Sequence, residues 1–239
     1  MKTGSAWILI MRRELGAFFS SPVAYIVSAL FLVFSGLLFF STFFLVNRAE
    51  LRNFFSLLPV LYAFFIPALT MRLFAEEIRT GSLETLLTLP VSPLDAVLGK
   101  FAAALVFAFG MLLPTLLWVL TASILGRPDF GPIIGGYIGS FFLAAAFTAI
   151  GVFASALTRN QIVSFFTAFA VCILLAMVDI FLVLVPAFLV TPLENLSATW
   201  HFSAIARGVL DSRDIIYFLS LTVLFLTATA GWLEHRRHS

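Results

Sequence analysis

The stretch GPIIGGYIGSFFLAAAFTAIGVFASAL, residues 131–157, decides the fold class because it runs for 27 residues without a charged side chain. A helix that crosses the hydrocarbon core of a bilayer needs about 20 predominantly apolar residues. The stretch is also apolar on every face, unlike a helix at the surface of a soluble protein. It therefore predicts a transmembrane helix.

Five further stretches of this kind lie on either side of it, and the composition agrees with them. Apolar residues make up 62% of the 239 residues and charged residues 11%, against about 25% charged in a typical soluble domain. We expect an all-α integral membrane protein with a single domain over residues 1–239 and little room for a separate catalytic or nucleotide-binding domain. The six predicted spans cover about residues 23–46, 54–71, 98–125, 131–157, 162–185 and 215–233.

Lysine and arginine counts predict the orientation, because these residues are enriched in short cytoplasmic loops. With a cytoplasmic N-terminus, nine of them lie inside and five outside, so both termini are expected in the cytoplasm. The nine are Lys2, Arg12, Arg13, Arg72, Arg79, Lys100, Arg159, Arg236 and Arg237, and the five are Arg48, Arg52, Arg127, Arg207 and Arg213. The net charge of +2 is not gathered into a basic run, which argues against a nucleic-acid partner.

The residues before the first span predict a helix at the membrane surface. Apolar residues recur at helical spacing from Trp7 to Phe19, while Arg13, Gly16 and Ser20 share another face. This pattern is typical of a helix in the headgroup plane. Such a helix is often a simple anchor, and the pattern leaves any further role open.

The segment from Arg72 to Lys100, between spans two and three, holds seven of the 26 charges. Span two is expected to continue as a helix through Arg79 and to stop near Gly81, since glycine is favoured just after a helix end. Ser82 then suits the N-cap of a short helix. An ordinary loop between two spans does not need a helix stop signal followed by a helix start signal.

A further helix start follows at Ser92, with Pro93 in the first helical position and an acid two residues later. The segment is thus expected to hold a short amphipathic helix at the cytoplasmic surface, with Leu83, Leu86 and Leu87 on one face. A soluble partner can hold such a helix in a groove. The alternative is a solvated loop whose charges keep it out of the bilayer.

Several short motifs carry a family resemblance. They are PVAY at 22–25, AEEIRTGSLE at 75–84, LP at 89–90, LGK at 98–100, HF at 201–202, ARGVLD at 206–211 and RDIIYF at 213–218. With these motifs the chain resembles the ABC-2 type transporter permeases, and most closely the small six-span branch that contains the gliding-motility permease and its bacterial relatives. The similarity covers nearly the whole chain, and the Glu-Glu-x-Arg-x-Gly block is its most specific part.

The resemblance implies that the 72–100 segment carries a coupling helix, which docks in a cleft of a separate ATP-binding subunit. The residues implied are Glu76, Glu77, Arg79, Gly81 and Glu84, and Leu86 and Leu87 are the expected apolar anchors. It also implies a working unit with a second permease chain, identical or similar, in a bacterial cytoplasmic membrane. ATP is then bound by the partner subunit, and a companion protein on the outer face is a further expectation.

The residues themselves predict no ATP site and no hydrolase site. Gly99-Lys100 is followed by Phe101, and no glycine precedes Gly99 at the spacing of a phosphate-binding loop. The motifs His-Glu-x-x-His and Gly-x-Ser-x-Gly do not occur. The single cysteine, Cys172, excludes an internal disulfide and fits no metal-binding pattern. We therefore expect a subunit that is not itself an enzyme and holds no metal or cofactor.

Small and helix-bending residues mark three of the spans. Glycines four residues apart in span four allow a close helix approach, either within the chain, which is favoured, or at a seam between two permeases. Prolines in span two and a glycine–proline pair in span three are expected to bend those helices. The glycines of span four are Gly131, Gly135 and Gly139, the prolines of span two are Pro59 and Pro67, and the pair in span three is Gly110 with Pro114.

Two features lie toward the outer surface. Asp179 is the one acid well inside an apolar stretch, and a carboxylate there is costly and often functional. We favour a structural or interfacial role, with substrate contact as the alternative. Residues 186–214 are expected to form a short helix on the outer leaflet, or else a plain loop. Its apolar face is Phe202, Ile205, Ala206 and Val209, with Trp200 as an interface anchor.

The favoured function is therefore the membrane-spanning permease of an ABC exporter. One alternative is a non-transporting scaffold that recruits a soluble partner through the 72–100 segment. Another is an ion-coupled secondary transporter, which would need several ionisable residues near the bilayer midplane. The sequence does not identify a substrate.

Overall fold

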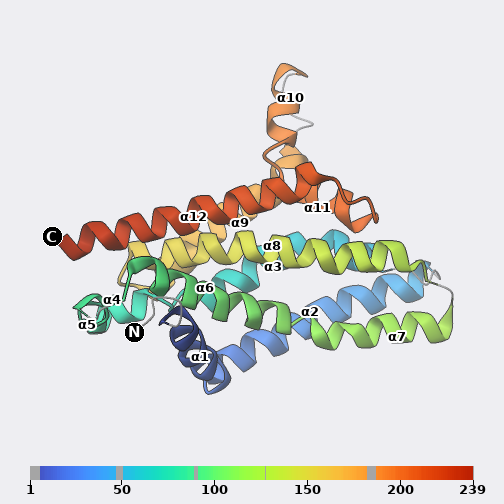
Figure 1. Ribbon diagram of the computed structural model, residues 1–239. Coiled ribbons are helices and arrows are strands. Elements are labelled where there is room, and N and C mark those ends of the chain that lie inside the picture. Colours follow the sequence, from blue (N-terminus) through green and yellow to red (C-terminus); the bar gives the residue numbers. More distant parts are fainter. Residues whose placement is uncertain (1–5, 47–50, 89–90, 127, 182–186, 239) are drawn as a thin grey trace.

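A computed structural model describes residues 6–46, 51–88, 91–126, 128–181 and 187–238 (Figure 1). Over these ranges the chain is helical and contains no strand. The elements are α1 (Ala6–Phe19), α2 (Pro22–Val46), α3 (Arg52–Thr70), α4 (Ala75–Thr80), α5 (Ser82–Thr88), α6 (Pro93–Gly110), the 3-10 turn η2 (Leu113–Thr115), α7 (Leu116–Leu125), α8 (Phe130–Leu157), α9 (Gln161–Phe181), α10 (Ala187–Glu194), α11 (Ala198–Ala206) and α12 (Ser212–His238).

Six of the described segments are long and apolar enough to cross a membrane, which confirms the predicted all-α membrane fold with six spans. They are Pro22–Ser41, Arg52–Thr80, Pro93–Leu125, Phe130–Leu157, Gln161–Ile180 and Ser212–Arg237. The last span was predicted too short, because α12 begins at Ser212 and its polar end stays helical to His238. In Figure 1 the end of α12 lies at the same end of the bundle as α1, α4 and α5. We call this the terminal end, and the opposite one the distal end.

Helix α8 lies at the centre of the bundle and packs against α3, α6, α9, α11 and α12. Its glycines allow close packing against another helix of the same chain, which agrees with the favoured prediction. A Cβ atom on Gly135 would lie 2.3 Å from the carbonyl oxygen of Ile205 in α11, and one on Gly139 would crowd Phe202. The glycine face of α8 is therefore filled by α11 of the same chain.

Spans two and three are both interrupted. In span three the predicted bend is found, because α6 ends at Gly110 and η2, which contains Pro114, separates it from α7. In span two, Pro59 and Pro67 lie inside α3, which continues to Thr70. The prediction that span two runs on as one helix through Arg79 was wrong, because the turn at residues 71–74 separates α3 from α4.

The one short helix predicted within 186–214 is replaced by α10, α11 and the first residues of α12; residue 186 lies outside the described residues. Phe202 and Ile205 are buried against the bundle as expected. Val209 was wrongly placed on the helix face, because Gly208 adopts a left-handed backbone (φ +85°) just after α11 and leaves Val209 exposed. Trp200 is exposed, in keeping with an interface anchor.

A buried hydrogen bond between His201 and Asp214 joins α11 to α12. His201 Nδ1 lies 2.6 Å from Asp214 Oδ1, and His201 Nε2 lies 3.2 Å from the carbonyl oxygen of Asn195. Tyr217 stacks on the His201 ring and donates a hydrogen bond to the carbonyl oxygen of Leu196 at 2.6 Å. These contacts make α11 a fixed part of the distal end.

Candidate functional site

The candidate site is the polar surface at the terminal end, where α4, which leads into α5, contacts α1 and α6. Gly81 separates α4 from α5 and has a left-handed backbone (φ +75°), the conformation that favours glycine after a helix. No atom lies within 4 Å of where its Cβ would be, so the requirement for glycine is conformational. Ser82 is the first residue of α5 rather than its cap, so the cap was predicted one residue too late.

The start of α4 is held by a side chain from another helix. Ser155 Oγ of α8 accepts hydrogen bonds from the backbone N–H groups of Phe74 (2.7 Å) and Ala75 (3.1 Å). These are among the N–H groups that lack partners at a helix start. The Ser155 hydroxyl therefore caps α4 from α8, which explains why the chain can break between α3 and α4.

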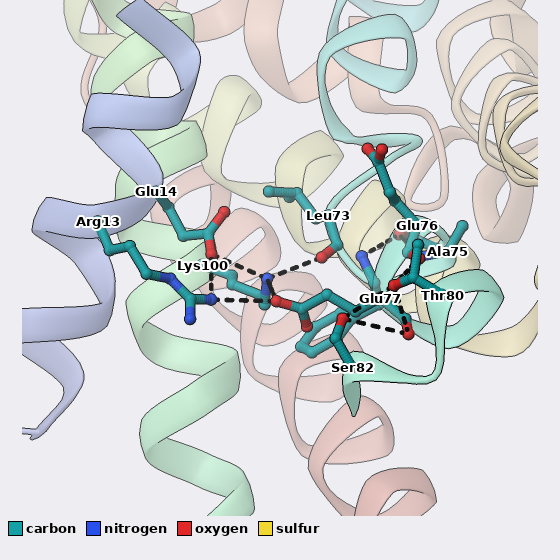
Figure 2. Close-up of polar contacts among 11 residues, drawn as sticks. Arg13, Glu14, Leu73, Ala75, Glu76, Glu77, Thr80, Ser82 and Lys100 are labelled. Atoms are coloured by element: carbon teal, nitrogen blue, oxygen red, sulfur yellow. Dashed lines mark hydrogen bonds and ion pairs between the residues drawn. The ribbon is translucent and has the colours of Figure 1, made fainter. Parts of the chain in front are cut away.

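A network of alternating charges joins α4 to α1 and α6 (Figure 2). Lys100 Nζ, on α6, donates to Glu14 Oε1 of α1 at 3.0 Å, to Glu77 Oε1 of α4 at 2.9 Å and to the carbonyl oxygen of Leu73 at 2.8 Å. Arg13 Nη2 contacts the same two carboxylate oxygens at 2.7 and 3.0 Å. We call Arg13, Glu14, Glu77 and Lys100 the charge network.

The charge network carries no net formal charge, and three of its four side chains are largely shielded from water. The side chain of Lys100 is 1% exposed, and those of Glu14 and Glu77 are 13% and 18% exposed. Each of the three ammonium protons of Lys100 has an acceptor, which a buried cation requires. Its ammonium also lies 5.0 Å from the ring centroid of Phe74.

The network changes the acidity of the groups on α1. Burial alone would raise the pKa of Glu14, but the charge of Lys100 and the hydrogen bonds from Arg13 and Lys100 outweigh it and hold the pKa below its usual value. The hydrogen bond to Glu14, followed by the charges of Glu14 and Glu77, raises the pKa of Arg13. Both groups on α1 are therefore favoured in their charged forms.

Close packing of α1 on α6 brings the network together. A Cβ atom on Gly99, next to Lys100, would lie 2.8 Å from Ile10 Cβ and from the carbonyl oxygen of Trp7. The start of α6 itself follows the predicted pattern. Ser92 accepts from the Asp95 backbone N–H at 3.1 Å, with Pro93 as the first helical residue.

The predicted site residues divide into an inner and an outer set. Glu77 is the inner one and contacts the charge network. Glu76, Arg79, Gly81 and Glu84 are exposed at the terminal end, and Figure 2 shows Glu76 pointing away from Lys100. Leu83 is buried, and Leu86 and Leu87 lie in α5 with side chains outside the described part of the structure.

Two cavities border this segment. One, of about 240 Å³, is lined by Phe18, Arg72, Glu76 and the charge network residues Glu14, Glu77 and Lys100. The other, of about 470 Å³, is lined by Arg79 of α4, Arg159 and the first residues of α9. The exposed face of α4 thus carries acidic groups and also has a basic rim. No cluster of three or more metal-ligating side chains occurs among the residues described.

Asp179 lies in α9, in a different part of the bundle from the charge network. Its Oδ1 atom is buried and has no hydrogen-bond partner among the described residues. A buried carboxylate oxygen without a donor is costly. This is compatible with the interfacial role and with substrate contact, so both alternatives stay open.

Sequence reasoning missed Glu14 and Ser155, and it did not include Arg13 or Lys100 among the site residues. The one available signal was Lys100, which lies among small and apolar residues at the start of a predicted span. Such a lysine needs a partner. The identity of the partner was not readable, because Glu14 lies 86 residues away in the chain.

Comparison with known proteins places most of the chain in one family. A family model described as "ABC-2 family transporter protein" matches residues 23–230, which is most of the chain. No curated protein gave a significant match. The matched range includes α4, α5 and Lys100, and begins after α1. The finer resemblance to the gliding-motility branch stays a prediction.

Proposed function

The chain belongs to the ABC-2 transporter family, and we propose that it is the permease subunit of an exporter whose ATP is hydrolysed by a separate subunit. Membership implies pairing with an ATP-binding subunit. We place the chain in a bacterial cytoplasmic membrane with the terminal end in the cytoplasm. In this proposal it carries no ATP site of its own, in keeping with the absence of a phosphate-binding loop from its sequence.

The distribution of basic residues supports this orientation. Arg72, Arg79 and Arg159 lie in or beside the connections at the terminal end, together with the basic end of α12. Arg52, Arg207 and Arg213 lie at the starts or ends of helices at the distal end. An excess of basic residues marks the cytoplasmic side of a membrane protein.

The observation that carries the coupling proposal is the double contact of Glu77. Through one carboxylate oxygen, α4 is tied to Lys100 at the start of span three and to Arg13 of α1. A force applied to the exposed face of α4 and α5 would therefore reach α6 and α1 through short, charge-assisted contacts. This is the connection that a coupling helix needs.

We assign the two sets of residues different roles in this coupling. Glu76, Arg79 and Glu84 are exposed, and we expect them to contact the ATP-binding subunit, with Leu86 and Leu87 as apolar anchors. Gly81 sets the direction of α5 relative to α4, and Glu77 passes the motion inward. The basic rim at Arg79 and Arg159 would match acidic groups on the partner.

We further propose that the working unit contains two permease chains, identical or similar. The glycine face of α8 is already occupied by α11, so the second chain must use another surface. Mass measurement of the complex in native-like lipid should show two permease copies. An active complex with a single copy would overturn this part of the proposal.

The test of coupling is the double substitution Leu86→Ala with Leu87→Ala, measured by copurification of the ATP-binding subunit and by its substrate-stimulated hydrolysis. Apolar anchors at the centre of an interface contribute about 2 kcal/mol or more, so binding or stimulation should fall strongly. Glu84→Ala alone should be milder, because an exposed ion pair contributes about 0–1 kcal/mol.

The matched control is Val209→Ala with Leu210→Ala, a pair of exposed apolar residues at the distal end. It should leave assembly and stimulation intact, and both double variants should keep the melting midpoint of the isolated permease. If the Leu86/Leu87 variant also keeps full assembly and stimulation, the 72–100 segment is a solvated loop. The scaffold or secondary transporter would then be the better account.

A further inference from the structure

A cavity of about 200 Å³ lies between the start of α3 and α11 at the distal end, away from the charge network. Arg52 of α3 and Arg207 at the end of α11 both line it, and both residues are exposed. No ion pair engages either guanidinium within the described ranges. Two cations thus share one cavity without an acidic partner from those ranges.

The start of α3 adds to the positive potential. The N-cap residue, Leu51, gives no side-chain hydrogen bond to the helix, and the first turn contains no acid. A helix N-terminus carries a partial positive charge that acidic residues usually offset. Here Arg52 stands in the first helical position instead. The cavity is therefore suited to an anion.

The remaining polar groups of the cavity offer lone pairs rather than protons. Ser56 donates to the carbonyl oxygen of Asn53 at 2.8 Å, Ser203 to that of Trp200 at 2.8 Å, and Thr199 to that of Ala176 at 2.6 Å. Each hydroxyl oxygen can still accept a hydrogen bond. A matching ligand therefore combines an anionic group with nearby O–H or N–H donors.

The surface below the cavity is apolar and faces outward. Arg52, Ser56, Val60 and Phe64 follow at intervals of four residues and form a row that winds slowly around α3. Val60 and Phe64 are partly exposed, and Phe64 also contacts the rings of Phe165 and Phe169 of α9. At about 1.5 Å per residue, this row runs roughly 18 Å along the helix. One leaflet of a bilayer core is about 15 Å deep. The row therefore matches the length of a lipid chain.

We propose that this cavity binds the headgroup of a phospholipid from the leaflet at the distal end. Arg52 and Arg207 hold the phosphate, and the three hydroxyl oxygens accept hydrogen bonds from hydroxyl or ammonium groups of the headgroup. The lipid chains lie along Val60 and Phe64. The cavity is smaller than the roughly 300–1,000 Å³ of sites for drug-sized ligands, so it suits a headgroup alone. This inference does not depend on the proposed export function.

The test is native mass spectrometry of the full chain in detergent, titrated with three probes. Dioleoylphosphatidylglycerol carries phosphate, hydroxyl donors and chains, dioleoylglycerol lacks the phosphate, and glycerol 1-phosphate lacks the chains. We expect saturable binding of phosphatidylglycerol at least tenfold tighter than that of either other probe. Equal binding of glycerol 1-phosphate would assign the cavity to a soluble phosphate and overturn the lipid source. Equal binding of dioleoylglycerol would show that the phosphate is not recognised.

Variants locate the binding. Arg52→Gln with Arg207→Gln should weaken phosphatidylglycerol binding at least tenfold, whereas Arg213→Gln, an exposed arginine at the same end, should not change it. Because neither cavity arginine is in an ion pair within the described ranges, the double variant should keep its melting midpoint. Unchanged phosphatidylglycerol binding by a folded double variant would overturn the proposal.

Discussion

Replacing Lys100 by methionine tests whether the charge network holds α1, α4 and α6 together. Methionine has a similar length but no charge, so the substitution removes the ammonium without leaving a large void. Glu14 Oε1 and Glu77 Oε1 would then share only Arg13, and the carbonyl oxygen of Leu73 would lose the donor it has in the structure. Two mostly buried carboxylates would face a single cation.

The size of the effect follows from the exposure of the groups. Removal of one partner from a buried pair costs about 3–5 kcal/mol. The 13% and 18% exposure of the two glutamates allows partial solvation, so we expect the lower end, about 3 kcal/mol. Arg13→Met removes the other cation, whose side chain is 57% exposed, and should cost about 0–1 kcal/mol.

The measurement is the free energy of unfolding of the purified chain in mixed micelles, followed by circular dichroism as the denaturing detergent is increased. A third variant, Lys100→Met with Glu14→Gln and Glu77→Gln, removes the unpaired charges as well. It should recover part of the loss, because replacing a whole buried network is far less costly than breaking it. If Lys100→Met costs no more than Arg13→Met, or if the triple variant is the least stable, the network does not hold the helices as described.

Three further predictions follow from single sites. The pKa of Glu14 is lowered in the folded state, so its contribution to stability is complete above the usual pKa of about 4.5 and is lost as the pH falls through the lower, folded-state pKa. The difference in stability between wild type and Glu14→Gln should therefore be constant from pH 8 to 5 and shrink below pH 4.5. Gly81→Ala should cost about 1–2 kcal/mol from its left-handed backbone alone, and Gly208→Ala should cost more in the same unfolding measurement, because its Cβ would also lie 3.2 Å from the backbone of Gly131. In a Cys172→Ala background, a cysteine at Ser82 should resist impermeant thiol reagents in intact cells while one at Leu210 reacts, and the reverse pattern would invert the proposed orientation.

Local features of the fold were predictable because their signals lie within a few residues. The six spans, the glycine after α4 and the capped start of α6 at Ser92 all depend on residues close together in the chain. The break after Thr70 was not predictable, since the side chain that caps α4 comes from Ser155, 81 residues from Phe74. Chain-local patterns contain no information on such a partner.

The same limit explains why only half of the candidate site was found. The exposed acids of α4 and α5 were visible as charges in a polar segment, whereas the role of Glu77 depends on Lys100 and on Arg13, which lies 64 residues away. Adjacent residues Glu76 and Glu77 look alike in the sequence. Only the packing of α1 on α6 separates an exposed carboxylate from one that contacts two cations.

The difference between the exposed Glu76 and the network residue Glu77 affects how α4 and α5 can move. Helix α4 has six residues, far fewer than the roughly 12–15 that an isolated helix needs, so its conformation depends on its neighbours. Those neighbours are Ser155 at its start, the charge network at its middle and Gly81 at its end. A displacement of α4 that left α1 and α6 in place would have to separate Glu77 from both cations. A displacement that carries α1, α4 and the start of α6 together keeps those contacts and separates α4 from Ser155 of α8 instead. Neutral hydrogen bonds are weaker than charge-assisted ones, so α1 should move with α4 and α5.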